Sequence, residues 1–392
     1  MAACEGLSAP WDVLLVARGG TALATTRQTI RNVADRAPCE RVRFHVFFDT
    51  QRSLFDPGGL NVSFYDTDDE TLARTFSPLA RKWHGEFRKH RHAQTFTAVK
   101  LFAVELLPSY VEDVVILDAD VVPLTSVAGL LAQVRLRSAA AGSMVAFAYA
   151  AESQPFYRWV FGAAGDAGLG GGPGVTRGFG FNGGVAVQRL GRLRSGPSRG
   201  AYYGVLERLL GRKRAIAGAV RPPRWYQTKL APRKTYRFAL SMLFGDQTVL
   251  SIADVLMPDE MKRLFILLPC EWNVQICLYY YVAMANGVAP MPQPCGLPSA
   301  WRPRATASPE AARKGPCLPF VDQTCRAPPR LLHMNTGPAK FVAAAESRRE
   351  FERSLSTFVG RKYARECRVV RKLYPYMHAR LCNVSWLLSA AD

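Results

Sequence analysis

Two aspartates separated by one residue are the first side chains in this sequence with a chemistry to offer. Asp118 and Asp120 follow a run of four apolar residues, 114–117. Side chains alternate along an extended chain, so we expect both carboxylates on one side of it, at the edge where open α/β sheets bind their ligands. Hard oxygens at this spacing suit Mn²⁺ or Mg²⁺. Taken alone, the pattern also fits two exposed acids in a loop.

A histidine and a lysine near residue 335 extend this chemistry. His333 directly follows the apolar residues 331–332, and Lys340 comes seven residues later. An imidazole beside two carboxylates completes a ligand set for Mn²⁺, and a lysine can stabilise the charge that develops on a diphosphate. As isolated residues, they also fit a structural histidine and a solvated surface lysine.

A glycine-rich segment and a helix start supply further candidates. Residues 178–184 read GFGFNGG and precede an expected strand, whereas a dinucleotide-binding fingerprint follows a strand and opens a helix. The glycines would instead let the backbone approach a ligand, with the Asn182 amide free to bond sugar hydroxyls; a simple turn is the alternative. Asp246 and Gln247 begin an apolar helical run, where Asp246 is either a helix cap or a ligand-facing acid.

An alternating pattern of strands and helices must position these residues. We expect helices over 25–35 and 95–107, and strands over the apolar runs 11–17, 42–48, 61–65, 114–117, 144–150 and 184–187. The predicted fold is one α/β domain over residues 11–360, a mixed, mostly parallel sheet flanked by helices. It carries a basic insertion at 189–240, built around a short helix at 203–210. A Pro/Cys-rich insertion at 284–329 and a C-terminal extension at 361–392 complete the predicted organisation.

The composition indicates a globular protein with a basic surface. Its 392 residues are 48% apolar, and 51 Lys and Arg face 31 Asp and Glu, for a formal charge of +20. Such a surface attracts phosphates, nucleic acids, acidic glycans or anionic lipid heads. A polyanion-binding or nucleic-acid-binding protein is therefore the rival interpretation, motivated by aromatic residues within the basic insertion. It leaves the ordered motifs unexplained, so we expect no specific nucleic acid partner. The oligomeric state stays open.

The cysteines and sequons bear on the cellular compartment. Seven of the nine cysteines come after residue 269 and none forms a CxxC pair, so disulfides in a lumenal compartment are favoured over a zinc site or plain buried thiols. Sequons at Asn61 and Asn383 agree with the secretory pathway, and the Golgi lumen is the expected location. The sequence shows no secretory signal or membrane span, which leaves a cytoplasmic location open.

Read together, these segments resemble family 8 glycosyltransferases, and within that family the LARGE-type xylosyltransferase domain. Residues 268–275, LPCEWNVQ, look like that family's Leu-Pro-Cys-x-Trp-Asn-Val-Gln segment, and residues 332–335, LHMN, strengthen the likeness. The resemblance covers roughly residues 13–358 without the two insertions. The combination of motifs is specific, although each motif by itself is not.

The resemblance implies a GT-A fold and retaining, metal-dependent transfer from a UDP-sugar to a glycan or glycoprotein acceptor, with Mn²⁺ or Mg²⁺ as cofactor and xylose as the favoured sugar. Its implied metal ligands are Asp118, Asp120 and His333, and its implied catalytic residues are Asp246, Gln247 and Lys340. The implied donor-binding residues are Ala17, Arg18, Lys100, Asp118, Ala119, Asp120, Asn182, Gly183, Gly337 and Lys340. Thr248 and Ser251 replace the Asp and Asn common in the family, which bears on the sugar. An inactive relative acting as a lectin or scaffold is a third interpretation.

Overall fold

The computed structural model describes residues 10–17, 19–37, 41–48, 59–88, 94–151, 174–176, 180–219, 245–275, 330–333 and 353. The chain divides into two compact units. The first comprises Met1–Leu23, Cys39–Asp118 and Ala128–Leu268, and the second comprises Ala24–Pro38, Ala119–Val127 and Pro269–Asp392. The predicted insertion at 284–329 and extension at 361–392 lie outside the described residues, and the predicted domain limits stay predictions.

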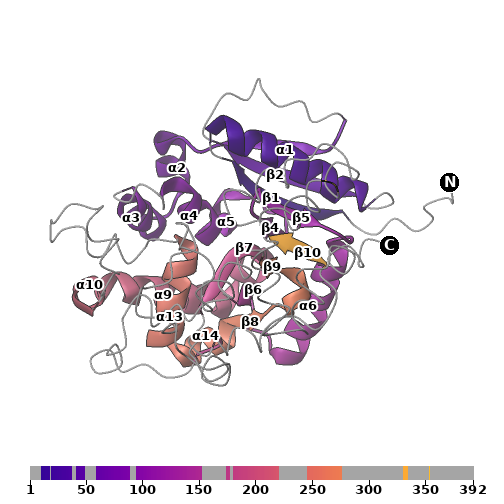
Figure 1. Cartoon of the computed structure of the whole chain (residues 1–392). Coiled ribbons are helices and arrows are strands. Elements are labelled where there is room, and N and C mark those ends of the chain that lie inside the picture. Colours follow the sequence, from indigo (N-terminus) through magenta and orange to yellow (C-terminus); the bar gives the residue numbers. More distant parts are fainter. Residues whose placement is uncertain are drawn as a thin grey trace, which may run out of the picture. The chain divides into compact units, whose positions relative to one another are not determined.

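A seven-stranded sheet forms the centre of the first unit (Figure 1). Its spatial order is β3-β2-β1-β4-β7-β6-β8. Neighbouring strands pair in parallel except where β7 pairs antiparallel with β4 and β6, so β7 alone runs against the others. The predicted mixed, mostly parallel sheet is confirmed. The strands are β1 (Trp11–Ala17), β2 (Val42–Phe48), β3 (Val62–Asp66), β4 (Val114–Leu117), β6 (Phe147–Ala151), β7 (Phe181–Gln188) and β8 (Phe265–Leu267).

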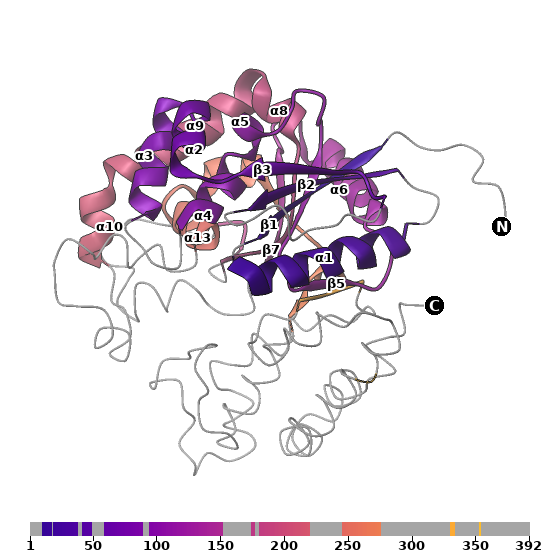
Figure 2. The same cartoon turned by 90° about the horizontal axis from the view of Figure 1, so that it is seen from above.

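The central strands are apolar on both faces because helices cover the sheet on both sides. Every residue of β4 is fully buried, as the continuous apolar run predicts for a central strand. In both views, α4, α9 and α13 lie on one side of the sheet, and α6 lies on the other (Figures 1 and 2). The helices of this unit are α2 (Asp69–Thr75), α3 (Pro78–Phe87), α4 (Gln94–Leu101), α5 (Ala103–Leu106), α6 (Ala128–Ala141), α8 (Leu190–Arg194), α9 (Gly196–Gly211), α10 (Lys213–Ala219), α13 (Asp246–Leu256) and α14 (Pro258–Leu264).

Several elements differ from their predicted form. The helix expected over 95–107 breaks at Phe102 into α4 and α5, because φ of −116° and ψ of 27° take Phe102 out of helical geometry. Strand β7 begins at Phe181, so Asn182 and Gly183 lie inside a strand that we expected to start after them. The start of the basic insertion is also core, since α9 buries Tyr202, Leu206 and other apolar side chains completely. The apolar face of α9, rather than the charge on its surface, determines how this helix packs.

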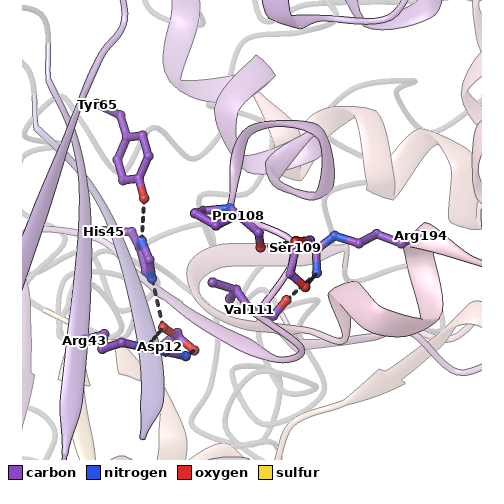
Figure 3. Close-up of polar contacts among 8 residues, drawn as sticks. All are labelled: Asp12, Arg43, His45, Tyr65, Pro108, Ser109, Val111 and Arg194. Atoms are coloured by element: carbon purple, nitrogen blue, oxygen red, sulfur yellow. Dashed lines mark hydrogen bonds and ion pairs between the residues drawn. The ribbon is translucent and has the colours of Figure 1, made fainter.

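Two polar networks stabilise the first unit, one across its strands and one at the turn before β4 (Figure 3). Asp12 on β1 accepts two hydrogen bonds of 2.7 Å from Arg43, and its Oδ1 lies 2.9 Å from His45 Nε2. His45 Nδ1 in turn lies 2.9 Å from the Tyr65 hydroxyl, which links β1, β2 and β3. Arg194 donates to four carbonyl oxygens of the turn before β4, those of residues 107, 108, 109 and 111. The approach to β4, which Asp118 directly follows, is therefore firmly held.

The second unit contains a three-stranded sheet of β5 (Val121–Pro123), β10 (Leu331–His333) and β9 (Val274–Gln275). Strand β10 lies in the middle, antiparallel to β5 and parallel to β9. A 3-10 turn, η4 (Cys270–Trp272), leads into β9, and Arg330 stacks its guanidinium over the Trp272 ring at 5.1 Å. Residues 270–275 and 331–333, which carry much of the family resemblance, are thus neighbours in space. Helix α1 (Gly19–Asp35) supplies residues to both units. Within the described part of the chain, no helix has the length and apolarity needed to cross a membrane.

Candidate active site

The end of β4 delivers Asp118 to a buried lysine. Lys100, on α4, donates a 2.6 Å hydrogen bond to Asp118 Oδ1 and a 2.9 Å bond to the carbonyl oxygen of Gly183. The Lys100 side chain is 9% exposed. A backbone bond from Asp118 to Gly184 closes the same corner. The ammonium therefore ties the carboxyl end of β4 to the first residues of β7.

Asp246 faces the same corner from the first residue of α13. Gly245, with φ of 65°, takes the capping position, and no side-chain capping bond forms, so Asp246 is not the helix cap. Its side chain is buried, and Oδ2 has no hydrogen-bond partner among the described residues. Burial raises the pKa of Asp246 to about 6; Lys100 opposes this shift and Asp118 adds to it. Burial of a carboxylate oxygen that lacks a donor is costly.

Gly183 lies against Asp246 and Gln247 at a distance that only glycine permits. A Cβ at position 183 would lie 2.5 Å from Asp246 Oδ2 and 3.1 Å from Gln247 Cγ. The structure therefore brings together Lys100, Asp118 and Gly183 with the first turn of α13, as the resemblance implied. Asn182 is also there, and its Oδ1 accepts a 2.9 Å hydrogen bond from the Gly184 amide.

In the second unit, His333 and Asp120 lie together. His333 pairs with Val121 across β10 and β5, which places its Nε2 3.4 Å from Asp120 Oδ1, and both side chains are buried. The turn that contains Asp120 is held by Thr29, whose hydroxyl donates 2.9 Å to the carbonyl oxygen of Ala119 and also lies 3.3 Å from that of Val121. The predicted partnership of Asp120 and His333 is therefore present in the structure.

Other predicted residues divide between described and undescribed parts. Ala17 ends β1 and is buried. Arg18, Gly337 and Lys340 lie outside the described residues. Sequence reasoning missed Gln188, whose amide nitrogen donates 2.7 Å to the backbone oxygen of Lys100 and so fixes the helix that carries this lysine. No local pattern marks such a residue, because its partner lies 88 positions away.

No protein-family model and no curated protein matches this chain. Among solved structures it is similar to mouse xyloside xylosyltransferase 1, at 17% identity over 84% of this chain and 98% of that one, with a TM-score of 0.49. It is also similar to the galactosyltransferase LgtC, solved with donor and acceptor sugar analogues, at 16% identity over 80% and 94%, TM-score 0.40. The bifunctional glycosyltransferase WbbM matches at 15% identity over 89% of this chain and 52% of its own, TM-score 0.47.

Proposed function

We propose that this chain is a retaining glycosyltransferase of the GT-A fold, which moves a sugar from a UDP-sugar to a glycan or glycoprotein acceptor. The observation that carries the proposal is the buried Asp246 carboxylate, whose Oδ2 has no hydrogen-bond partner within the described part of the chain and which lies against Gly183, beside the Lys100–Asp118 pair. These groups converge at the carboxyl end of β4, where open α/β sheets bind nucleotides and their ligands. A hydroxyl-rich sugar supplies the hydrogen-bond donor that Asp246 lacks.

The ligand set at the Asp-x-Asp turn fits a divalent ion. Asp118 and Asp120 are two residues apart in the chain, His333 lies beside Asp120, and each of the three can offer one ligand atom. Two carboxylate oxygens and one imidazole nitrogen suit Mn²⁺, with Mg²⁺ as the second choice, and leave coordination positions open. When bound, this ion would neutralise charge on the leaving diphosphate. We propose that Thr29 keeps the turn in shape for this role.

The remaining residues act on the donor by position and charge. Lys100 is an ammonium held in a nearly dry corner, where its charge acts more strongly on a diphosphate than it would in water. We propose that Lys340 meets the same diphosphate. Gly183 lets the sugar approach the backbone, and Asp246 accepts from a sugar hydroxyl. Because a neutral Gln247 amide is a poor nucleophile, we propose front-face attack by the acceptor, with the leaving phosphate as base.

The sugar, the compartment and the acceptor surface are further parts of the proposal. Xylose is favoured because residues 270–275 and His333 carry the resemblance to xylosyltransferases, and the late cysteines favour the Golgi lumen. The rival polyanion-binding function loses support from the structure of the basic insertion. Arg189, Arg208 and Lys213 there form ion pairs with Asp113, Glu260 and Glu86, so these three basic residues are matched by acids of the fold itself.

Asp120→Asn tests the proposal directly. The change keeps the shape of the side chain and removes a charge that the metal requires, so we expect loss of nearly all transfer with an unchanged melting temperature. The measurement is Mn²⁺-dependent release of UDP from a panel of UDP-sugars with an acceptor. Asp66→Asn, at an exposed acid that ends β3, is the matched control and should keep wild-type activity. Wild-type turnover by Asp120→Asn with Mn²⁺ would remove the metal assignment, and an inactive wild type would favour a lectin.

A further inference from the structure

Asp254, on the last turns of α13, is a buried carboxylate that the proposed reaction does not use. It is 1% exposed. Its Oδ1 accepts a 2.6 Å hydrogen bond from the Val175 amide, and its Oδ2 accepts from the amide and the hydroxyl of Thr176 at 3.0 and 2.6 Å. Burial raises the pKa of Asp254, and these bonds oppose the shift. The three donors that converge on this carboxyl group offset part of the cost of its burial.

The same helix also bonds to Phe181, directly before Asn182. The Thr176 hydroxyl, besides donating to Asp254, accepts 3.0 Å from the Gly180 amide. One residue further, the Phe181 amide donates 2.9 Å to Ser251 Oγ, which in turn donates 2.6 Å to the backbone oxygen of Gln247. Side chains of α13 thus bind the backbone directly before Asn182.

Gly174 and Gly183 both lie very close to α13. A Cβ on Gly174 would lie 2.2 Å from Asp254 Oδ1, just as a Cβ on Gly183 would lie 2.5 Å from Asp246 Oδ2. Asp246 and Asp254 are eight residues apart on one helix, or about 12 Å along its axis. A single rigid element therefore sets the position of the Asp246 carboxylate and of the strand start that faces it.

We propose that Asp254 is a positioning residue for donor binding: through Thr176 it fixes the backbone before Asn182, and so the place of Asn182 and Gly183 relative to Asp246. This inference rests on the proposed glycosyltransferase function. An anchor needed only for stability would lower the melting temperature and leave the donor's Michaelis constant alone. A positioning residue acts on donor binding even in protein that stays folded.

Thr176→Val and Thr176→Ser form a matched pair for the test. Valine removes the hydroxyl at nearly constant volume, and serine keeps it. Asp254→Asn, which turns one acceptor oxygen into a donor that faces other donors, is the second perturbation. Asp113→Asn is the control, because Asp113 is also a buried carboxylate, and its ion-pair partners among the described residues are Arg135 and Arg189, outside this segment.

Kinetics with a UDP-sugar and Mn²⁺ give the first readout. We expect Asp254→Asn and Thr176→Val to raise the donor's Michaelis constant roughly tenfold, with kcat at saturating donor changed less than about twofold. Thr176→Ser should restore the wild-type value. Asp113→Asn should lower the melting temperature without this change in the Michaelis constant.

Hydrogen exchange of backbone amides gives a readout independent of activity. The amides of Val175, Thr176, Gly180 and Phe181 should exchange faster in Asp254→Asn and Thr176→Val than in the wild type and the control. Wild-type donor kinetics in both variants, with only a lower melting temperature, would overturn the inference. A wild type that turns over no nucleotide sugar would instead defeat the proposed function and the donor role together. Hydrogen exchange at these four amides would still show whether Asp254 and Thr176 hold this backbone segment.

Discussion

Replacing Asp246 by asparagine should make the metal-free protein more stable while removing its transferase activity. Folding raises the pKa of Asp246 from 3.8 to about 6, chiefly by burial, so the folded chain holds this proton more tightly than the unfolded chain. The wild type therefore loses stability as the pH rises from 3.8 to about 6, and the loss is constant above that range. This difference in the pKa of Asp246 between the folded and the unfolded chain lowers the free energy of unfolding by about 3 kcal/mol at pH 7.5 and by about half of that at pH 5.

Urea unfolding in EDTA at the two pH values measures this difference. Asparagine resembles the neutral carboxyl, so Asp246→Asn should gain about 3 kcal/mol in the free energy of unfolding at pH 7.5 and about half of that at pH 5. Asp259→Asn, at an exposed acid on α14, should change stability by a few tenths of a kcal/mol at either pH. A variant with equal or lower stability than the wild type at pH 7.5, and no pH dependence in the difference, would refute the reasoning that Asp246 is a buried charge without sufficient compensation.

Three further predictions concern the metal, the acceptor and the donor. Thr29→Val should weaken Mn²⁺ binding roughly tenfold by calorimetry, because the turn loses its bond to Ala119, while Thr29→Ser should not; equal affinities would show that the turn needs no such support. Arg212, just before α10, and Arg214, on α10, are both exposed. Neutralising them should raise the acceptor's Michaelis constant and leave donor hydrolysis unchanged. An equal loss of acceptor transfer and donor hydrolysis would contradict an acceptor role. UDP-xylose should exceed UDP-glucose and UDP-galactose in turnover at equal concentration with Mn²⁺, because a pocket closed to the extra carbon rejects hexoses by a clash; a clear preference for either hexose would exclude the xylose assignment.

The sheet was predictable because each of its central strands is indicated by an apolar run in the sequence. The run at 114–117 is apolar on both faces, which is what a central strand between two layers of helices requires, and β4 occupies that position. Ligand chemistry predicted Asp120 and His333 as partners at a metal site, and the structure places the two side chains 3.4 Å apart. The break at Phe102 was not, because residues on both sides of it have helical periodicity and the tertiary packing decides.

The groups that hold the site in shape left no trace in the sequence. Thr29, Gln188 and Asp254 each bond to residues 78 or more positions away, and a threonine, glutamine or aspartate in a helix or strand has no local feature that reveals such a partner. The packing of the basic insertion could not be predicted from the sequence for a related reason. Its arginines dominate the composition, whereas the apolar stripe of α9 determines where the helix packs.

The charges at the carboxyl end of β4 favour a sugar hydroxyl as the group that would meet Asp246 in the proposed reaction. Lys100 lies 2.6 Å from Asp118, so these two charges largely balance each other. Asp246 is then the excess negative charge, which is why burial and Asp118 together raise its pKa against the pull of Lys100. No donor among the residues that the structure describes meets Oδ2, and Gly183 beside it has no side chain to provide one. A cationic ligand would satisfy Asp246 equally well, but it would meet the Lys100 ammonium in the same corner. A neutral hydroxyl supplies the hydrogen bond without that repulsion, and this favours a sugar over a basic group.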